Sequence, residues 1–130
     1  MVVLDTTFLI HFLRNKKSAV EKAKKLKEAS TTRINIFEVL VGIYNKKTEK
    51  QDNELVVFYN FIEALKILEL DAKSADTAAR ISAGLRQKGE TVTETDILIA
   101  AIALTNGEEE ILTQNTKDFS KIPDIRIEKY

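Results

Sequence analysis

The chain has 130 residues, and its twenty Lys or Arg balance its twenty Asp or Glu, so the formal net charge is zero. We expect residues 1–130 to form one domain with a real core. Zero net charge argues against a protein that mainly coats nucleic acid, because such binding comes from neutralising phosphates. One histidine and no cysteine exclude disulfide frameworks, thiolate metal sites and Ser-His-Asp hydrolases.

The hydropathy of the chain indicates a protein without a membrane partner. No apolar run is long enough to span a bilayer. The start, MVVLDTTFLI, lacks the basic residues of a signal peptide and has an early Asp. We therefore expect a cytoplasmic protein.

Short apolar runs alternate with helical patterns along the whole chain. This alternation predicts an α/β fold with a parallel sheet that helices cover on both faces. We expect strands at 2–4, 30–33, 66–70, 110–113 and 125–129. We expect helices at 6–14, at 18–29, from 33 to about 45, at 54–65, from 71 through 88 and at 94–106, and one helical turn at 115–122. A Ser18–Glu21 capping box is expected to begin the helix at 18–29, and Gly89 and Gly107 are expected to end the two helices that precede them. A loop is expected at 45–53.

Glu38 has an apolar setting in the segment RINIFEVLVG, residues 33–42. Helical spacing places it beside Ile34 and Val41, on a stripe that we expect to face the core. A carboxylate there is costly unless the backbone, an ion or solvent satisfies it.

Polar residues gather where strands end and helices begin. Asp5 follows the first strand, and Thr113 and Asn115 follow a late strand. Ligands of parallel sheets bind outside these carboxyl ends. Glu38 and Asp96 are expected in the first turns of their helices, so the acids are predicted to converge on one crevice, together with Asn115 or Asp118.

Each of these acids also fits a helix cap. The pairs Asn35–Glu38, Thr93–Asp96 and Asn115–Asp118 have capping-box spacing, and a single acid of this kind is more often a cap than a ligand. The set favours a shared cation, because convergent carboxylates in apolar surroundings repel one another. Oxygen-only ligands select Mg²⁺ or Mn²⁺, and such sites usually act on phosphate esters.

Four blocks, VVLDTTFLI, NIFEVLVG, LRQKGETVTETDILIAAIA and ILTQNTKDF, resemble those of PIN-domain nucleases, in particular the VapC-type ribonuclease toxins of toxin–antitoxin pairs. The resemblance runs from Val2 to Phe119. It implies a PIN-like three-layer α/β/α sandwich with a central parallel sheet. It also implies endonucleolytic hydrolysis of RNA to a 5′-phosphate and a 3′-hydroxyl, a homodimer, and inhibition by a VapB-type antitoxin protein.

The same resemblance implies roles for the site residues. Asp5 and Asp96 would be the principal ligands of Mg²⁺, which Mn²⁺ could replace, and Glu38 would complete the acidic cluster. Thr6 would support Asp5, and Thr113 would line the pocket. The family often has a fourth acid where this chain has Asn115; Asp118 either takes that role or caps its short helix, and we favour the cap.

Other patterns leave alternatives open. Residues 54–65 are apolar nearly all round, so Val57, Phe58 and Phe61 either form an interface or lie buried in the domain. His11 is interpreted as a packing residue and not a catalyst. A catalytically degenerate PIN-fold binding module is an alternative function; a phosphoacceptor domain fits poorly, because Asp5 has no acidic neighbour and no suitable Lys precedes the last strand.

Overall fold

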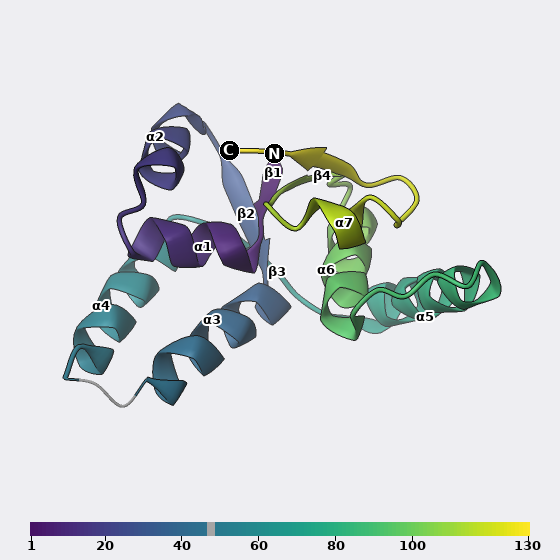
Figure 1. Ribbon diagram of the computed structural model, residues 1–130, viewed down its shortest axis with the longest axis horizontal. Coiled ribbons are helices and arrows are strands. Elements are labelled where there is room, and N and C mark those ends of the chain that lie inside the picture. Colours follow the sequence, from purple (N-terminus) through teal and green to yellow (C-terminus); the bar gives the residue numbers. More distant parts are fainter. Residues whose placement is uncertain (47–48) are drawn as a thin grey trace.

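The fold is a three-layer α/β/α sandwich around a parallel sheet, as predicted (Figure 1). The computed structural model describes residues 1–46 and 49–130. The strand order is β3-β2-β1-β4-β5, and all four neighbouring pairs are parallel. The strands are β1 Val2–Leu4, β2 Ala29–Thr32, β3 Lys66–Leu68, β4 Glu110–Leu112 and β5 Arg126–Glu128. The helices are α1 Thr6–Leu13, α2 Lys17–Lys25, α3 Arg33–Asn45, α4 Gln51–Ile62, α5 Ala72–Gln87, α6 Glu94–Thr105 and α7 Thr116–Phe119.

Two hydrophobic cores lie on opposite faces of the sheet. Leu85 of α5, Ile99 of α6 and Phe119 of α7 belong to one core. Phe8 of α1 and Phe58 of α4 belong to the other. The strands between them read as short apolar runs because both of their faces are covered.

Helix α6 is buried on almost every side. Its residues from Ile99 through Ala103 have no exposed surface. The small side chains of Ala100, Ala101 and Ala103 let it lie close to its neighbours, and its packing against α5 is the most extensive between any two elements. This helix therefore holds its first turn, which carries Asp96, firmly in place.

The predicted ends of α5 and α6 are confirmed. The Asp71 carboxylate accepts a hydrogen bond from the Ser74 amide at 2.9 Å, which completes a capping box before α5. Gly89 and Gly107 follow the two helices with φ of +70° and +77°, the left-handed conformation that ends a helix and favours glycine.

The predicted start and end of α2 are wrong. The helix begins after Lys16 without a side-chain cap, so Ser18 and Glu21 form no capping box. It ends at Lys25, because the residues from Ala29 pair with Val2 of β1 as a strand. Pairing to the central strand thus overrides a helical pattern that continues to residue 29.

Helix α4 begins at Gln51, three residues earlier than predicted, so the predicted loop at 45–53 is too long. Residues 47–48 of that loop lie outside the described residues. Phe58 is fully buried, which favours the interpretation of α4 as part of the domain. Val57 is nevertheless exposed, so the helix also presents apolar surface to the outside.

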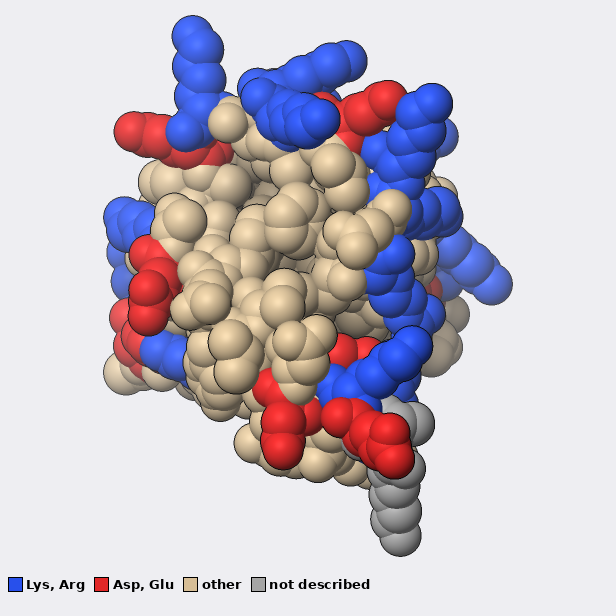
Figure 2. Space-filling model, turned by 90° about the vertical axis from the view of Figure 1, so that its left-hand side faces the viewer, with Lys and Arg blue, Asp and Glu red and all other residues tan. Residues whose placement is uncertain are grey.

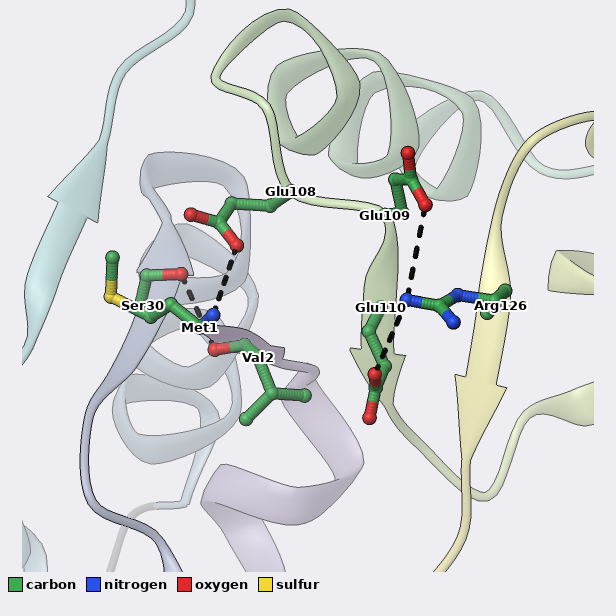
Figure 3. A network of polar contacts seen from close by, with 7 residues as sticks. All are labelled: Met1, Val2, Ser30, Glu108, Glu109, Glu110 and Arg126. Atoms are coloured by element: carbon green, nitrogen blue, oxygen red, sulfur yellow. Dashed lines mark hydrogen bonds and ion pairs between the residues drawn. The ribbon is translucent and has the colours of Figure 1, made fainter.

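The amino ends of the strands carry paired charges (Figure 3). The Met1 amine lies 3.6 Å from Glu108, and Arg126 lies 3.8 Å from both Glu109 and Glu110. Ser30 donates a hydrogen bond to the Val2 carbonyl oxygen at 3.3 Å. This edge of the sheet is therefore polar and largely neutralised.

Within the described ranges, no helix combines the length and the apolar character needed to cross a membrane.

Candidate functional site

The sheet reverses its winding direction between β1 and β4. The chain places β2 and β3 on one side of β1, and β4 and β5 on the other. Loops that leave the carboxyl ends of such neighbouring strands diverge and open a crevice. Asp5 follows β1 and Thr113 follows β4, so these two residues meet at this point.

Asp5 is held by hydrogen bonds on both carboxylate oxygens. The Thr113 hydroxyl donates to Oδ2 at 2.6 Å, and Asn35 Nδ2 donates to Oδ1 at 3.1 Å. Only 3% of the Asp5 surface is exposed. The backbone N–H of Thr113 bonds to the Glu128 carbonyl at 3.1 Å, which ties this support to the edge strand β5.

Helix α3 connects Asp5 to Glu38 through a short chain of hydrogen bonds. Asn35 Nδ2 also lies 3.0 Å from the Thr6 oxygen, and the Thr6 hydroxyl donates to Glu38 Oε1 at 2.7 Å. Thr32 caps the helix in a capping box with Asn35. The Thr6 hydroxyl therefore donates to Glu38 and not to Asp5, the acid that it was predicted to support, and Asn35 links Thr6 to Asp5.

Two predictions about Glu38 are wrong. The helix begins at Arg33 after the Thr32 cap, so Glu38 lies in the second turn and forms no capping box with Asn35. The stripe around it does not face the core, since Phe37 is 59% and Val41 41% exposed. Glu38 is half-buried at the edge of the crevice, where its partner is Thr6.

Asp96 enters the crevice from the first turn of α6. The Thr93 side chain accepts a hydrogen bond from the Asp96 amide at 3.4 Å, as the predicted cap requires. Asn115 Nδ2 donates to Asp96 Oδ2 at 2.9 Å. The Asp118 carboxyl group also lies close enough to raise the pKa of Asp96. Asn115 makes no capping bond with its side chain, which does not support the preferred interpretation of Asn115–Asp118 as a cap.

The site is acidic, and its two aspartates are buried. Burial is the main cause that raises the pKa of Asp5, and the Glu38 charge adds to it, while the Thr113 hydrogen bond opposes it. Burial also raises the pKa of Asp96 to about 7, with further contributions from Asp118 and the Asp5 charge. Two aspartates that are nearly buried and feel each other's charge need a cation to stay ionised together.

A comparison with protein families shows to which family this chain belongs. The model of the PIN domain matches residues 2–125. The chain belongs to the PIN domain family.

Individual relatives agree with this assignment over nearly the full length of the PIN domain. Ribonuclease VapC of Rickettsia bellii is 31% identical over 97% of this chain and 93% of its own length. The tRNA(fMet)-specific endonuclease VapC of Salmonella typhimurium is 30% identical, covering 98% of this chain and 96% of its own. The chain is therefore similar to VapC ribonucleases.

Solved structures show the same fold. The crystal structure of DNA-bound VapBC from Salmonella typhimurium superposes with a TM-score of 0.86 and 30% identity, over 99% of this chain and 98% of that one. VapBC2 of Rickettsia felis, bound to a promoter DNA fragment, gives the same TM-score at 24% identity, over 100% and 99% of the two chains.

The nucleases of the PIN family generally depend on a divalent cation, and Asp5 and Asp96 carry the carboxylate oxygens that such ions prefer. In residues 1–46 and 49–130, none of the ion pairs involves Asp5, Glu38, Asp96 or Asp118. The same residues contain no group of three acidic or histidine side chains close enough to enclose an ion alone. Water and substrate oxygens would have to complete the coordination shell, as is usual for Mg²⁺.

Asn35 has a role in the site beyond the capping pair with Glu38 that its spacing predicts. It is completely buried and links Asp5, Thr6 and the Thr32 cap. A buried amide with four hydrogen-bonding positions suits this bridging role. The available signal was an Asn in the apolar run INIF, where a polar side chain requires a buried partner.

Proposed function

We propose that this chain is a divalent-metal-dependent endoribonuclease that hydrolyses RNA phosphodiester bonds as the toxin of a VapBC-type pair. The convergence of Asp5 and Asp96 in one buried crevice of a PIN domain carries this proposal. The names of the VapC relatives support RNA as the substrate. The expected products are a 5′-phosphate and a 3′-hydroxyl.

Asp5 and Asp96 would hold the ion, which we propose to be Mg²⁺, with Mn²⁺ able to replace it. When bound, such an ion supplies Lewis acidity toward the phosphate and lowers the pKa of a bound water. Thr113 and Asn35 orient the two oxygens of Asp5 by hydrogen bonds. Asn115 orients Asp96 in the same way. We place Glu38 as the third acid, which its hydrogen bond from Thr6 holds at the edge of the crevice.

Asp118 takes part in the site in this proposal. Because it raises the pKa of Asp96, Asp118 brings a further carboxyl group close to that residue. Asn115 has a neutral amide where an acid would bind a cation more strongly. A second cation beside Asp96 would therefore depend on the Asp118 carboxylate.

We also propose a VapB-type antitoxin as the protein partner, because solved relatives are VapBC assemblies. The side of the molecule on which α2 and α4 lie suits such a partner (Figure 2). It presents a broad uncharged surface with Lys and Arg gathered along its top and one edge. A groove of about 470 Å³ on this part of the molecule is lined by Phe8, Leu26 and Phe61, among others, and by Lys27 and Lys66.

Three further parts of the proposal concern the whole protein. We propose that residues 1–130 form one domain, because both cores pack against the same sheet. We propose a homodimer, in which the exposed apolar residues Phe37, Val41 and Tyr44 of α3 are covered. We place the protein in the cytoplasm, where its RNA substrate is made.

RNA cleavage with an Asp96→Asn variant tests the proposed function. We expect the parent chain to cleave RNA in Mn²⁺ and to lose activity in EDTA, and Asp96→Asn to lose at least about 100-fold in rate, as for removal of a group that stabilises the transition state. Glu94→Gln is the matched control, since Glu94 lies exposed in the same helical turn and should leave the rate unchanged.

Two outcomes would contradict this proposal. Cleavage that survives Asp96→Asn would mean that the site is elsewhere or that the activity belongs to a contaminant. A parent chain that binds RNA and cleaves none of it, with any divalent metal, would instead indicate a degenerate binding module.

A further inference from the structure

The only histidine of the chain lies beside the acidic crevice and has a defined partner. His11 Nδ1 is 2.6 Å from the Tyr130 hydroxyl. The Tyr130 ring packs edge-on against Phe8, with the ring centroids 5.0 Å apart. These contacts hold the chain after β5 against α1, whose first residue, Thr6, directly follows Asp5.

The arrangement leaves one nitrogen of the imidazole available. Burial, with the charges of Lys16 and Arg14, lowers the pKa of His11, so the ring is neutral at pH 7. Burial raises the pKa of Tyr130, so the phenol keeps its proton. We assign the phenol as the donor to Nδ1, which places the ring proton on Nε2. Within the part of the chain that the structure describes, no hydrogen bond to Nε2 is present.

The charges of Lys16 and Arg14 lower the pKa of His11, and the local backbone keeps both residues close to it. Asn15 has φ of +56°, a conformation that Asn tolerates better than most residues. It turns the chain so that the Lys16 amide donates to the His11 carbonyl at 2.9 Å. Arg14 and Lys16 are exposed, and neither takes part in an ion pair among residues 1–46 and 49–130.

His11 and Arg14 lie farther along α1 than its first residue, which follows Asp5. Thr7, His11 and Arg14 share one side of the helix at i, i+4 and i+7. A helix rises about 1.5 Å per residue, so His11 lies on the order of 9 Å from Asp5 along the axis. Burial raises the pKa of the Tyr130 phenol, and the Asp5 charge adds to this effect.

We propose that His11, Arg14 and Lys16 form a subsite for a backbone phosphate of the RNA, and that Tyr130 positions the His11 ring within it. The subsite rests on the proposed function, because it needs an RNA strand bound at the acidic crevice. An anion is the ligand that one N–H donor and two free cations select. The subsite also places positive charge beside the acidic crevice, whose negative charge repels the phosphates of the RNA.

Salt-dependent RNA binding tests this subsite. Binding of a labelled single-stranded RNA is measured by fluorescence anisotropy in Mn²⁺, in the Asp96→Asn background so that the RNA stays intact. We expect Arg14→Gln/Lys16→Gln to weaken binding about 10-fold and to reduce the slope of log Kd against log salt by about 0.7, the value for one lost phosphate contact on a single strand.

The matched control is Lys73→Gln/Lys88→Gln, which removes two exposed positive charges from α5 and its C-cap on the other face of the sheet. Its slope should equal that of the parent. Tyr130→Phe keeps the ring and loses the hydrogen bond to His11, so we expect about 3-fold weaker binding with an unchanged slope. In the active background, the double variant at 14 and 16 should raise KM and leave kcat unchanged.

The possible failures are distinguishable. If both double variants change affinity and slope equally, the two cations only balance the α1 terminus and the subsite is contradicted, while RNA cleavage by the parent still supports the function. If the parent neither binds nor cleaves RNA, the proposed function fails and the subsite fails with it.

Discussion

At the scale of the residue, Asp96 is the group whose environment departs furthest from that of an ordinary carboxylate. It is 7% exposed and close to both Asp5 and Asp118. Its pKa of about 7, against an ordinary value of 3.8, means that the metal-free folded protein binds a proton there that the unfolded chain has lost. Function at this position therefore has a cost in stability, which a bound cation would offset.

The first prediction concerns this linkage. Since the folded state binds the additional proton between about pH 4 and pH 7, stability of the metal-free protein should fall as pH rises through this window. Asp96→Asn is neutral at every pH and keeps an oxygen that can accept from Asn115. We expect the variant to melt higher than the parent at pH 8 in EDTA, by on the order of 5 °C, and to match it at pH 4.

Thermal unfolding followed by circular dichroism across pH 4 to 8 measures this difference. Glu94→Gln, in the same turn, serves as the control and should follow the parent. A constant difference between Asp96→Asn and the parent at all pH values would contradict the linkage.

At the scale of the element, two capped helices have different relations to the site. Thr32 caps α3, whose Asn35 holds Asp5 and Thr6. Asp71 caps α5, which supports α6 from outside and brings no side chain into the crevice. Helix caps of similar geometry should therefore affect activity differently.

The second prediction compares these two caps. Thr32→Ala should lower the free energy of unfolding by about 1–2 kcal/mol and also lower the rate of RNA cleavage, because Asn35 loses its partner. Asp71→Ala should lower the melting temperature and leave the rate unchanged. Both are measured by thermal unfolding and by cleavage assays well below the melting temperature.

The comparison has one decisive outcome. Equal effects of Thr32→Ala and Asp71→Ala on the cleavage rate would mean that loss of stability alone explains both variants, and that Asn35 has no role in positioning Asp5.

At the scale of the whole molecule, two apolar surfaces lie outside the cores. Phe37, Val41 and Tyr44 form one exposed row on α3, at i, i+4 and i+7. Val57 belongs to the exposed side of α4. Large apolar side chains in such rows mark interfaces more often than free surface.

The third prediction assigns one partner to each surface. Val41→Glu should convert the proposed homodimer to a monomer in sedimentation velocity, because it places a charge in the centre of the α3 row. Val57→Glu should leave the dimer intact and weaken inhibition by a VapB-type antitoxin by about 10-fold or more. Each variant is the control for the other, and a dimer that survives Val41→Glu contradicts the assignment of α3.

The amino-acid sequence by itself was enough to predict the order of strands and helices, the parallel sheet and the acids of the crevice. These depend on local signals: buried runs such as Val2–Leu4, the Asp71 cap, and glycines after α5 and α6. The PIN-type blocks around Asp5 and Asp96 are likewise contiguous in the chain. Such features can be recognised without knowing what packs against them.

Only the tertiary structure decided which partners these residues have. The bond between Thr113 and Asp5 joins residues 108 positions apart, and the one between His11 and Tyr130 joins residues 119 apart. The exposure of Phe37, the central position of Asn35 and the effect of Asp118 on the pKa of Asp96 depend in the same way on strand order and helix packing. No local pattern encodes them, because burial and hydrogen-bond partners arise when distant segments come together on the sheet.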